Sequence, residues 1–401
     1  MINCRVCDSE IFKIFCNLNK TPLANSYRDL NIQIEEEELF NLKVYFCNNC
    51  KLVQLPETVF PENIFSDYAY FSSYSKDWLA HSKELCIASL REFQIKHDDL
   101  IVEIASNDGY LLKNFKNQNY NNILGIEPAT NIAKFANNQN IRTENIFFNA
   151  ETAKDILKKY KFSKLIFSLN VLAHVPNVKS FVMGIKNILD KDGCWIVEFP
   201  HLLNLIKNTQ FDTIYHEHFS YFSILTLKFL LKKYDLRIFN IKKIKTHGGS
   251  LRVFICHQSS FFKESANVLK IINEEINYGL NDEAIYLNFQ QKVNNKKNKI
   301  HKYLKNLNDN KICGFGAPAK ATTLINYCKI DKYISFIIDN NTNKQNKYLP
   351  GTHIPIKDFE YMINTKPKNI LVFPWNISDE IIKELNNKGK FDFKIHTLDF
   401  N

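Results

Sequence analysis

The stretch Asp98–Leu112, DDLIVEIASNDGYLL, decides how the central part of the chain folds. It consists of a short apolar run, then a polar turn that contains a glycine, and then the beginning of a helical pattern. A strand that passes through such a turn into a helix places backbone N–H groups at the carboxyl edge of a sheet, where ligands bind. The stretch therefore predicts the first strand–turn–helix unit of a ligand-binding α/β domain.

Three further apolar runs follow this unit along the chain. They are NNILGIEPA from residue 121, KLIFSLNVLAHVP from residue 164 and GCWIVEFP from residue 193, and helical patterns such as VKSFVMGIKNIL lie between them. Strands that alternate with helices predict a parallel sheet with helices on both of its faces. We therefore expect one α/β domain over residues 66–258.

The turn of the first unit has a polar lining, formed by Glu103, Asn107, Asp108 and Gly109. Glu127 ends the second apolar run, where a carboxylate can bridge the hydroxyls of a ribose. The turn lacks G-x-G-x-x-G and its acidic residues would repel a pyrophosphate, so a dinucleotide is disfavoured. A cationic adenosine derivative, S-adenosylmethionine, fits better, with Asn170 facing its methionine portion. The alternative is a strand–turn–helix of the same shape that binds no cofactor.

A pair of CxxC motifs marks the first block of the chain, residues 1–65. These motifs are Cys4-x2-Cys7 and Cys47-x2-Cys50, and they hold four of the ten cysteines. In a reducing compartment, paired CxxC motifs indicate zinc rather than disulfides. Four thiolates leave no open position for water, so we expect a structural metal and not a catalytic one. The alternative, a redox dithiol pair, lacks the βαβ pattern that normally accompanies it.

The last part of the chain is expected to contain a helical connector and a second α/β unit. Apolar residues recur at helical spacing over residues 259–310, and a smaller Rossmann-like unit is expected over residues 311–401. The second unit begins with the glycine-rich turn GFGAPAK, which resembles a phosphate cradle. If a pyrophosphate binds there, its predicted contacts are Gly316, Ala317, Lys320 and Asn340. A tight turn with an empty site is the alternative.

The composition fits a globular protein of the cytoplasm. The chain has 401 residues, 45% of them apolar, and a formal net charge of +10 that we attribute to solvated lysines. No apolar run has the roughly 18 residues that a membrane span needs, and the N-terminus lacks the pattern of a signal peptide. No arginine-rich arm or RNA-binding aromatic motif is present, so nucleic acid is not an expected partner.

A cluster of polar and aromatic residues lies in residues 211–223, FDTIYHEHFSYFS. His216 and His218 are only two positions apart, so a metal bound there would need further ligands from elsewhere. Burying two histidines and Glu217 is costly unless they are paired, whereas an imidazole readily accepts a proton at neutral pH. A proton-transfer cluster is therefore favoured, with some of the aromatic residues filling a core. The stretch THGGSLRVF adds His247 and Arg252.

These motifs together resemble the sugar C-methyltransferases that act on nucleotide-activated 4-keto-deoxysugars. The matching pieces cover nearly the whole chain: both CxxC pairs, DYAYFSSYSKDWLAHS, EIASNDGYLL, GIEPA, NVLAHVPN, FDTIYHEHFSYFS, THGGSLRVF, GFGAPAKATTLINYC and KYLPGTHIPI. The resemblance implies a zinc-binding N-terminal domain, a central class I methyltransferase domain and a C-terminal Rossmann-like domain that helps to hold the nucleotide sugar. One departure is Ala105, which stands where the family usually has glycine and could crowd the cofactor.

The resemblance also implies roles for individual residues. His218 would take the proton from C3, beside the C4 ketone, and the carbon would then accept the methyl group of S-adenosylmethionine. Tyr215 and Glu217 would position the sugar and stabilise the enolate. Further candidates for contact with the reactants are Tyr70, Tyr74, His247 and Arg252. The rival functions are O- or N-methylation of a similar sugar, a dehydrogenase that uses the GFGAPAK turn, and a zinc-containing scaffold that binds nucleic acid.

Overall fold

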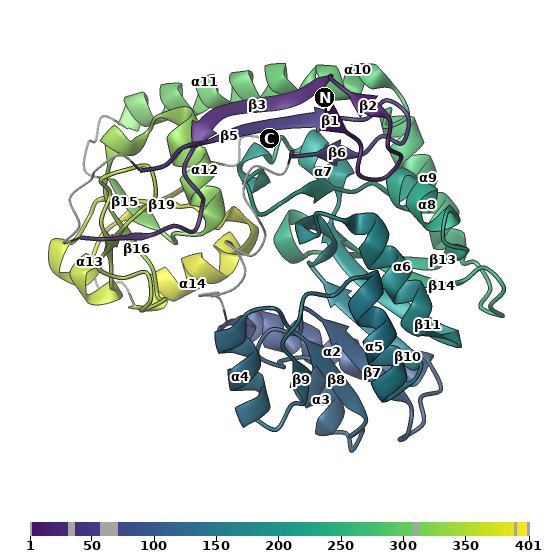
Figure 1. Cartoon of the computed structure of the whole chain (residues 1–401). Helices are drawn as coiled ribbons and strands as arrows, with labels where there is room; N and C mark the ends of the chain where they lie inside the picture. Colours follow the sequence, from purple (N-terminus) through teal and green to yellow (C-terminus); the bar gives the residue numbers. More distant parts are fainter. Residues whose placement is uncertain (1, 31–36, 57–70, 308–311, 389–390, 399–401) are drawn as a thin grey trace.

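The computed structural model describes residues 2–30, 37–56, 71–307, 312–388 and 391–398 (Figure 1). Its main element is a seven-stranded sheet with the strand order β13-β14-β11-β10-β7-β8-β9. The strands are β7 (Leu100–Ile104), β8 (Ile123–Ile126), β9 (Thr143–Glu144), β10 (Ser163–Leu169), β11 (Leu189–Pro200), β13 (Leu236–Ile244) and β14 (Ser250–His257). Only β14 runs antiparallel to its neighbours. The order reverses between β7 and β10, which is where open α/β sheets bind ligands.

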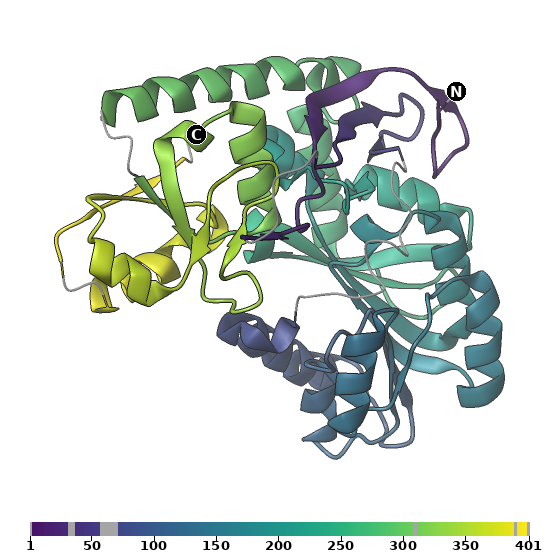
Figure 2. The same ribbon diagram turned by 60° about the vertical axis from the view of Figure 1, so that its left-hand side comes forward.

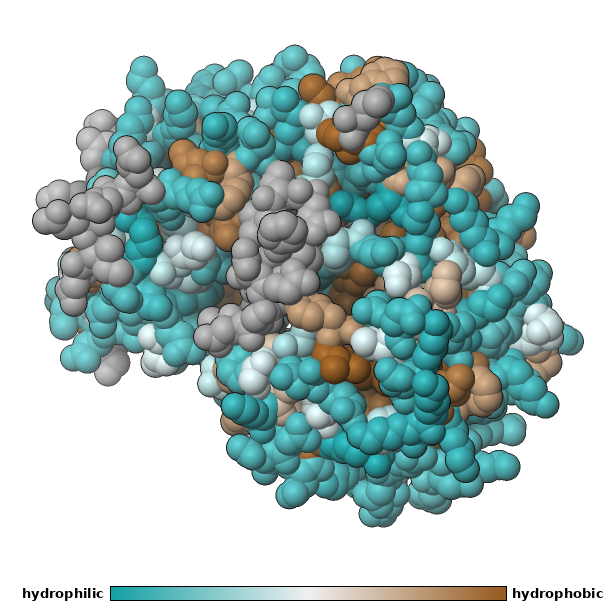
Figure 3. All heavy atoms as spheres, viewed as in Figure 1, coloured by the Kyte–Doolittle hydropathy of each residue, from teal (hydrophilic) through white to brown (hydrophobic). Residues whose placement is uncertain are grey.

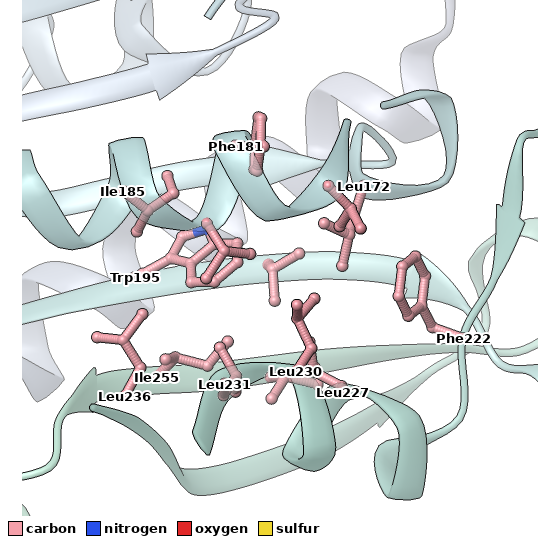
Figure 4. Packing of buried hydrophobic residues seen from close by; sticks show 14 of the residues in the cluster. Leu172, Phe181, Ile185, Trp195, Phe222, Leu227, Leu230, Leu231, Leu236 and Ile255 are labelled. Atoms are coloured by element: carbon pink, nitrogen blue, oxygen red, sulfur yellow. The ribbon is translucent and has the colours of Figure 1, made fainter. Parts of the chain in front are cut away.

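Helices cover both faces of this sheet, as the alternating pattern predicts. One face packs against α2 (Lys76–Glu92) and α3 (Leu112–Lys116), and the other against α5 (Ala150–Tyr160), α6 (Val178–Ile188), α8 (Ile224–Lys232) and α9 (Ala266–Tyr278). Figure 4 shows the second face: Phe181 and Ile185 of α6 lie on one side of Trp195, and the leucines of α8 lie on the other. The remaining helices of this domain are α4 (Thr130–Asn138) and α7 (Leu202–Lys207).

The N-terminal domain is joined to both other domains by strand pairing. Its four-stranded sheet contains β3 (Ile14–Thr21), β5 (Phe40–Phe46), β6 (Val53–Gln54) and, from the central part of the chain, β12 (Ser220–Tyr221). A second pairing joins β4 (Arg28–Asp29) to β17 (Lys347–Tyr348) near the C-terminus. A small hairpin, β1 (Ile2–Asn3) and β2 (Glu10–Ile11), carries the first CxxC motif between its strands.

The C-terminal domain is the predicted smaller Rossmann-like unit. Its five parallel strands are β15 (Ile312–Phe315), β16 (Ile334–Ile338), β18 (Ile356–Lys357), β19 (Asn369–Val372) and β20 (Lys394–Thr397), with helices α12 (Ala319–Cys328), α13 (Phe359–Thr365) and α14 (Ser378–Lys388). The expected helical connector contains α10 (Glu283–Leu287) and α11 (Phe289–Leu307). Phe289 of α11 stacks on Phe15 of β3 with ring centroids 4.3 Å apart, so this helix also supports the N-terminal sheet.

The three domains meet at one side of the central sheet. In both Figure 1 and Figure 2 the C-terminal domain lies beside the central domain, and α11 runs along β3 above them. Figure 3 shows that hydrophobic residues on one face form small groups separated by hydrophilic ones. None of the described helices is both long and apolar enough to cross a membrane.

Candidate active site

The segment Tyr215–His218 connects a short 3-10 turn, η3 (Phe211–Thr213), to strand β12. Phe211 and Ile214 before the polar residues and Phe219 after them are fully buried. These apolar anchors fix both ends of the segment, so that the polar residues between them are held in place. The expected core role of the aromatic residues therefore applies to Phe219, Tyr221 and Phe222, which are buried, whereas Tyr215 is half-buried.

The protonation state of His218 follows from its hydrogen bond. Its Nδ1 lies 2.8 Å from the carbonyl oxygen of Thr213. Because a carbonyl oxygen can only accept, Nδ1 carries the hydrogen and Nε2 carries the lone pair. Burial, together with the neighbouring imidazole of His174, holds the pKa of His218 well below its usual range. His218 is therefore neutral at physiological pH and can accept a proton at Nε2.

Two rings flank His218. The ring centroid of Tyr215 lies 4.0 Å from that of His218, and the ring centroid of His174 lies 4.8 Å from it. His174 ends the 3-10 turn η2 (Leu172–His174), and its Nδ1 lies 2.8 Å from the carbonyl oxygen of Glu217. None of the sequence motifs predicted a role for His174. The available signal was its position four residues beyond Asn170, just after a predicted strand.

Glu217 is held by a residue of the N-terminal domain. The side-chain amide of Asn25 donates to both carboxylate oxygens of Glu217, at 2.8 and 2.9 Å. Burial raises the pKa of Glu217 to about 7, while Asn25 and Lys344 oppose this shift. Glu217 is thus close to half-protonated at neutral pH. Asn25 could not be predicted from the sequence, because no local motif surrounds it.

His216 does not belong to this group. Its ring packs edge-on against Phe40 of β5, with centroids 5.8 Å apart. The side chain is buried, and within the described part of the chain neither ring nitrogen makes a regular hydrogen bond. His216 therefore contacts the N-terminal sheet and not the ring of His218.

The predicted cofactor turn adopts an unusual backbone. Ala105, Asn107 and Gly109 have φ values of +52°, +48° and +80°. A side chain on Gly109 would also come within 3.0 Å of Ile141, so glycine is required there. Left-handed φ is costly for alanine, which gives a physical reason for the glycine that the family usually has at the position of Ala105.

Two side chains of this turn bind protein rather than lining an open pocket. Asn107 Oδ1 accepts from the backbone N–H of Ser72 at 2.8 Å, and Asp108 Oδ2 accepts from that of Ser73 at 3.0 Å. They hold the 3-10 turn η1 (Ser72–Tyr74) against the end of β7. Tyr74 is 67% exposed, and Tyr70 lies outside the described residues.

Glu127 is preorganised to bind hydroxyl groups. Its carboxylate oxygens accept from the backbone N–H groups of Asn107 and Ala129, each at 2.9 Å. Burial raises the pKa of Glu127 to about 6. Each oxygen has a second lone pair, so the carboxylate can also accept from two neighbouring hydroxyls, as a ribose offers.

Several buried acceptors around the switch point lack a regular hydrogen bond within the described part of the chain. They are both carboxylate oxygens of Glu103, Oδ1 of Asp108 and Oδ1 of Asn170. Burial raises the pKa of Glu103 well above its usual range. Tyr110 and the backbone of Leu112 oppose this shift in part, so Glu103 is not without neighbours. Buried polar atoms are normally paired, so the oxygens of Asp108 and Asn170 in particular fit a ligand that carries positive charge and hydrogen-bond donors. S-adenosylmethionine has both, and the residues present therefore fit it.

His247 joins this group to the base segment. Its Nε2 lies 3.0 Å from the side-chain amide nitrogen of Asn170, and its ring packs edge-on against Trp78 of α2 at 5.7 Å. Burial lowers the pKa of His247 to about 4, and the charge of Lys320 contributes to the shift. His247 is therefore neutral and is placed beside the predicted methionine end of the cofactor site.

The four cysteines of the CxxC motifs converge. Their sulfur atoms all lie within 4.8 Å of one another, with Cys4 and Cys50 at 3.4 Å and Cys7 and Cys47 also at 3.4 Å. Tetrahedral zinc with bonds of about 2.3 Å needs sulfur atoms about 3.8 Å apart, so the four thiols fit this ion. A metal held by four thiolates contributes folding energy to the N-terminal domain.

Comparisons with known proteins agree with this geometry. Family models match over three regions: a zinc-binding domain at residues 4–65, a "Methyltransferase domain" at 78–240 and a "C-methyltransferase C-terminal domain" at 245–395. The chain is 32% identical to the C-methyltransferase NovU of Streptomyces niveus over 395 residues, which is 97% of this chain and 94% of NovU. The chain belongs to the zinc-containing, S-adenosylmethionine-dependent C-methyltransferases.

Solved structures with a similar fold cover about half of this methyltransferase. PH0226 of Pyrococcus horikoshii OT3 is 12% identical, covers 50% of this chain and 96% of its own, and gives a TM-score of 0.38. An S-adenosylmethionine-dependent methyltransferase from Clostridium acetobutylicum ATCC 824 is also 12% identical, covers 45% of this chain and 92% of its own, and gives a TM-score of 0.34.

Arg252 of the methyltransferase forms an ion pair and does not present a free guanidinium. Its Nε donates to Glu198 in the neighbouring strand β11, and the other carboxylate oxygen of Glu198 lies 2.8 Å from Nε2 of His81. Glu198 is fully buried and Arg252 is 7% exposed. Arg252 therefore neutralises a buried carboxylate of the central sheet, a role that the predicted substrate contact did not include.

The glycine-rich turn of the C-terminal domain is partly occupied by protein groups. The backbone N–H of Ala317 donates to Oδ2 of Asp339 at 2.8 Å, and the Ala317 carbonyl accepts from the hydroxyl of Tyr27 at 2.6 Å. At Gly316 a side chain would come within 2.4 Å of Pro374. A pyrophosphate at Ala317 would thus compete with a carboxylate, which the phosphate-cradle prediction did not foresee.

Lys320 points towards the base segment. Its ammonium lies 4.6 Å from the ring centroid of Trp375, and the indole N–H of Trp375 donates to Asp212 at 2.6 Å. Burial lowers the pKa of Lys320 to about 8, while Asp212 opposes the shift. The charge of Lys320 also lowers the pKa values of His218 and His247. Asn340, in contrast, is exposed on the surface.

Proposed function

We propose that this C-methyltransferase methylates C3 of a nucleotide-linked 4-keto sugar in the cytoplasm, within deoxysugar or surface polysaccharide biosynthesis. A ketoreductase is the expected enzyme to consume the product, because the ketone remains after methylation. The observation that supports this proposal most directly is the tautomer of His218. Its Nδ1–H is held by Thr213, which leaves Nε2 as a neutral base inside a buried cluster.

Carbon methylation requires removal of a C–H proton, and the site contains groups suited to this step. In our proposal, Nε2 of His218 takes the proton from the carbon beside the ketone, and the negative charge moves to the ketone oxygen. Glu217, with a pKa of about 7, can keep its proton and donate a hydrogen bond to that oxygen, with Tyr215 as a second donor. The bound sulfonium of S-adenosylmethionine supplies the methyl group.

The cofactor is expected to be bound mainly by the carboxyl ends of β7, β8 and β10. Glu127 would accept from the ribose hydroxyls, and Glu103 and Asn170 would face the positively charged methionine portion. The C-terminal domain would hold the nucleotide part of the sugar with Lys320 and the positive end of the GFGAPAK turn. The similarity to NovU, a C-methyltransferase, supports carbon as the methyl acceptor.

The test is to incubate the purified enzyme with S-adenosylmethionine and a panel of nucleotide 4-keto sugars, and to locate the new methyl group by NMR. A methyl group on oxygen or nitrogen would contradict the proposal. In deuterated buffer without cofactor, the wild-type enzyme should exchange the hydrogen beside the ketone, and O- or N-methylation needs no such exchange.

A pair of histidine variants sharpens this test. His218→Asn should lower turnover by about 10²–10⁴-fold, as expected for loss of a general base, and should abolish the exchange while cofactor binding is kept. His216→Phe, in the same segment but packed against Phe40, should retain both activities. Near-normal turnover of His218→Asn would remove His218 as the base.

A further inference from the structure

A single residue of the zinc-binding motif reaches the segment that carries the base. Arg5 lies between Cys4 and Cys7, and its guanidinium donates to the backbone carbonyl of Phe219, the residue directly after His218. The same guanidinium donates to the carbonyl of Leu55 at 2.9 Å. Arg5 thus bridges two chain segments that come together only in the folded protein.

The contact of Arg5 with Phe219 is made at several points. The guanidinium carbon lies 5.7 Å from the ring centroid of Phe219, and Nη1 also lies 3.3 Å from the hydroxyl of Ser220. The Phe219 ring is 1% exposed, and its carbonyl additionally accepts from the N–H of Leu55 at 3.0 Å. The peptide that follows His218 is therefore fixed from the side of the N-terminal domain.

The other side of His218 is fixed by its own segment. Its backbone N–H donates to the carbonyl of Tyr215 at 2.9 Å, and its ring is held by the Thr213 carbonyl. These local bonds set the conformation of the turn. The turn is anchored to the rest of the molecule by Asn25 and His174, which both bind Glu217, by the pairing of β12 with β6, and by Arg5. Among these anchors, Arg5 is the one that belongs to the zinc-binding motif.

We propose that Arg5 is a positioning residue through which the metal site fixes the catalytic base. The metal would hold the CxxC turn, the turn holds the guanidinium, and the guanidinium holds the peptide next to His218. This inference rests on the proposed function, because it takes His218 as the base. Arginine suits the role, since its planar fork can donate to two carbonyl oxygens at once and lysine has only a single point of charge.

A lysine of the central domain that binds the same CxxC turn provides a matched control. Lys233 at the end of α8 donates to the carbonyl of Val6 at 2.9 Å, so it also ties a cation to the CxxC turn. This hydrogen bond joins the CxxC turn to α8 of the central domain and does not contact the base segment. Loss of Lys233 should therefore weaken the docking of the turn without moving His218.

The experiment compares Arg5→Lys with Lys233→Met in the full-length enzyme. We measure kcat, KM for S-adenosylmethionine, zinc content and cofactor-independent deuterium exchange into the substrate. Arg5→Lys should retain one zinc per chain and a KM within about twofold of wild type, yet lose at least about tenfold in both kcat and exchange, because small misplacements of a catalytic group are costly. Lys233→Met should keep wild-type kcat. Arg5→Gln, whose shorter and uncharged side chain lacks the guanidinium fork, serves as a second variant.

Equal kcat values for the Arg5 and Lys233 variants would overturn the positioning role, and so would loss of zinc from Arg5→Lys. The proposed function fails separately. If His218→Asn keeps normal turnover, the base is misassigned whatever the Arg5 variants do. If His218→Asn is inactive while Arg5→Lys behaves like Lys233→Met, the base stands and only the role of Arg5 is lost.

Discussion

Replacing Glu217 by glutamine should stabilise the enzyme in a way that depends on pH. Burial raises the pKa of Glu217 from 4.5 to about 7. The folded state therefore binds this proton more tightly than the unfolded state does. Below pH 4.5 the carboxyl is protonated in both states and does not affect stability. As the pH rises from 4.5 through about 7, the unfolded state ionises while the folded carboxyl keeps its proton, so the stability falls, and above this range the loss is complete because the folded protein then buries the charge. Glutamine never carries that charge.

The size of the effect follows from the two pKa values. Each pKa unit corresponds to about 1.4 kcal/mol, so the full difference is about 3 kcal/mol, and about 2–3 kcal/mol of it falls between pH 5 and pH 8. Wild-type stability should fall by this contribution over that range relative to Glu217→Gln. At pH 5 the difference should be no more than about 1 kcal/mol, because only this first part of the linkage has been lost and a protonated carboxyl and an amide have similar shape and polarity.

The assay is urea unfolding at pH 5 and pH 8, monitored by tryptophan fluorescence. Glu198→Gln is the matched control with the opposite sign. Burial alone would raise the pKa of Glu198, but His81 and Arg252 hold it below its usual range. Removing this charge leaves a buried guanidinium without its partner, and should destabilise the protein by about 3–5 kcal/mol at pH 8. The reasoning about Glu217 is refuted if Glu217→Gln and wild type show the same change between the two pH values.

Two further predictions concern the zinc site and the cofactor turn. Cys47→Ser should lose zinc and unfold at a much lower temperature, because the metal contributes folding energy. Cys16→Ser, in the same domain but outside the sulfur cluster, should keep one zinc per chain. Elemental analysis measures the zinc content, and thermal melting measures the stability. Ala105→Gly should gain about 0.5–1 kcal/mol, because relief of the left-handed strain of about 1–2 kcal/mol exceeds the entropy cost of glycine. Ala153→Gly, inside α5, should instead lose about 1 kcal/mol, and a destabilised Ala105→Gly would contradict the strain argument.

The sequence was sufficient for the elements whose patterns are local. The strand–turn–helix unit around Glu103, the end of the next strand at Glu127 and the four converging cysteines all follow from short stretches with a fixed spacing. Burial in a parallel sheet gives continuous apolar runs, so the strands were visible as such. The fold class and the zinc site could therefore be predicted before any contact between distant segments was known.

The contacts that build the candidate site have no such local pattern. Asn25 and Glu217 are 192 residues apart in the chain, and Arg5 and Phe219 are 214 apart. Neither Asn25 nor Arg5 lies in a periodic stretch, and an asparagine or arginine on a loop is ordinarily solvated. The use of Asp339 to bind the Ala317 N–H was also hidden, because an acidic residue at a strand end looks the same whether it binds a ligand or the backbone.

The distribution of charge in the site explains why a carbon methyltransferase would recruit two extra domains around a sheet that already binds the cofactor. Burial raises the pKa of Glu217 to about 7 and lowers the pKa values of His174 and His247 to about 4, so at neutral pH the two imidazoles are neutral and the carboxyl is ionised only in part. In the mechanism that we propose, a buried site of low dielectric would strengthen the attraction between the positive sulfonium and the negative enolate, because charges are screened less there than in water. Asn25 from the N-terminal domain holds the carboxylate of Glu217, and Lys320 from the C-terminal domain places its charge near enough to His218 to lower the pKa of that imidazole further.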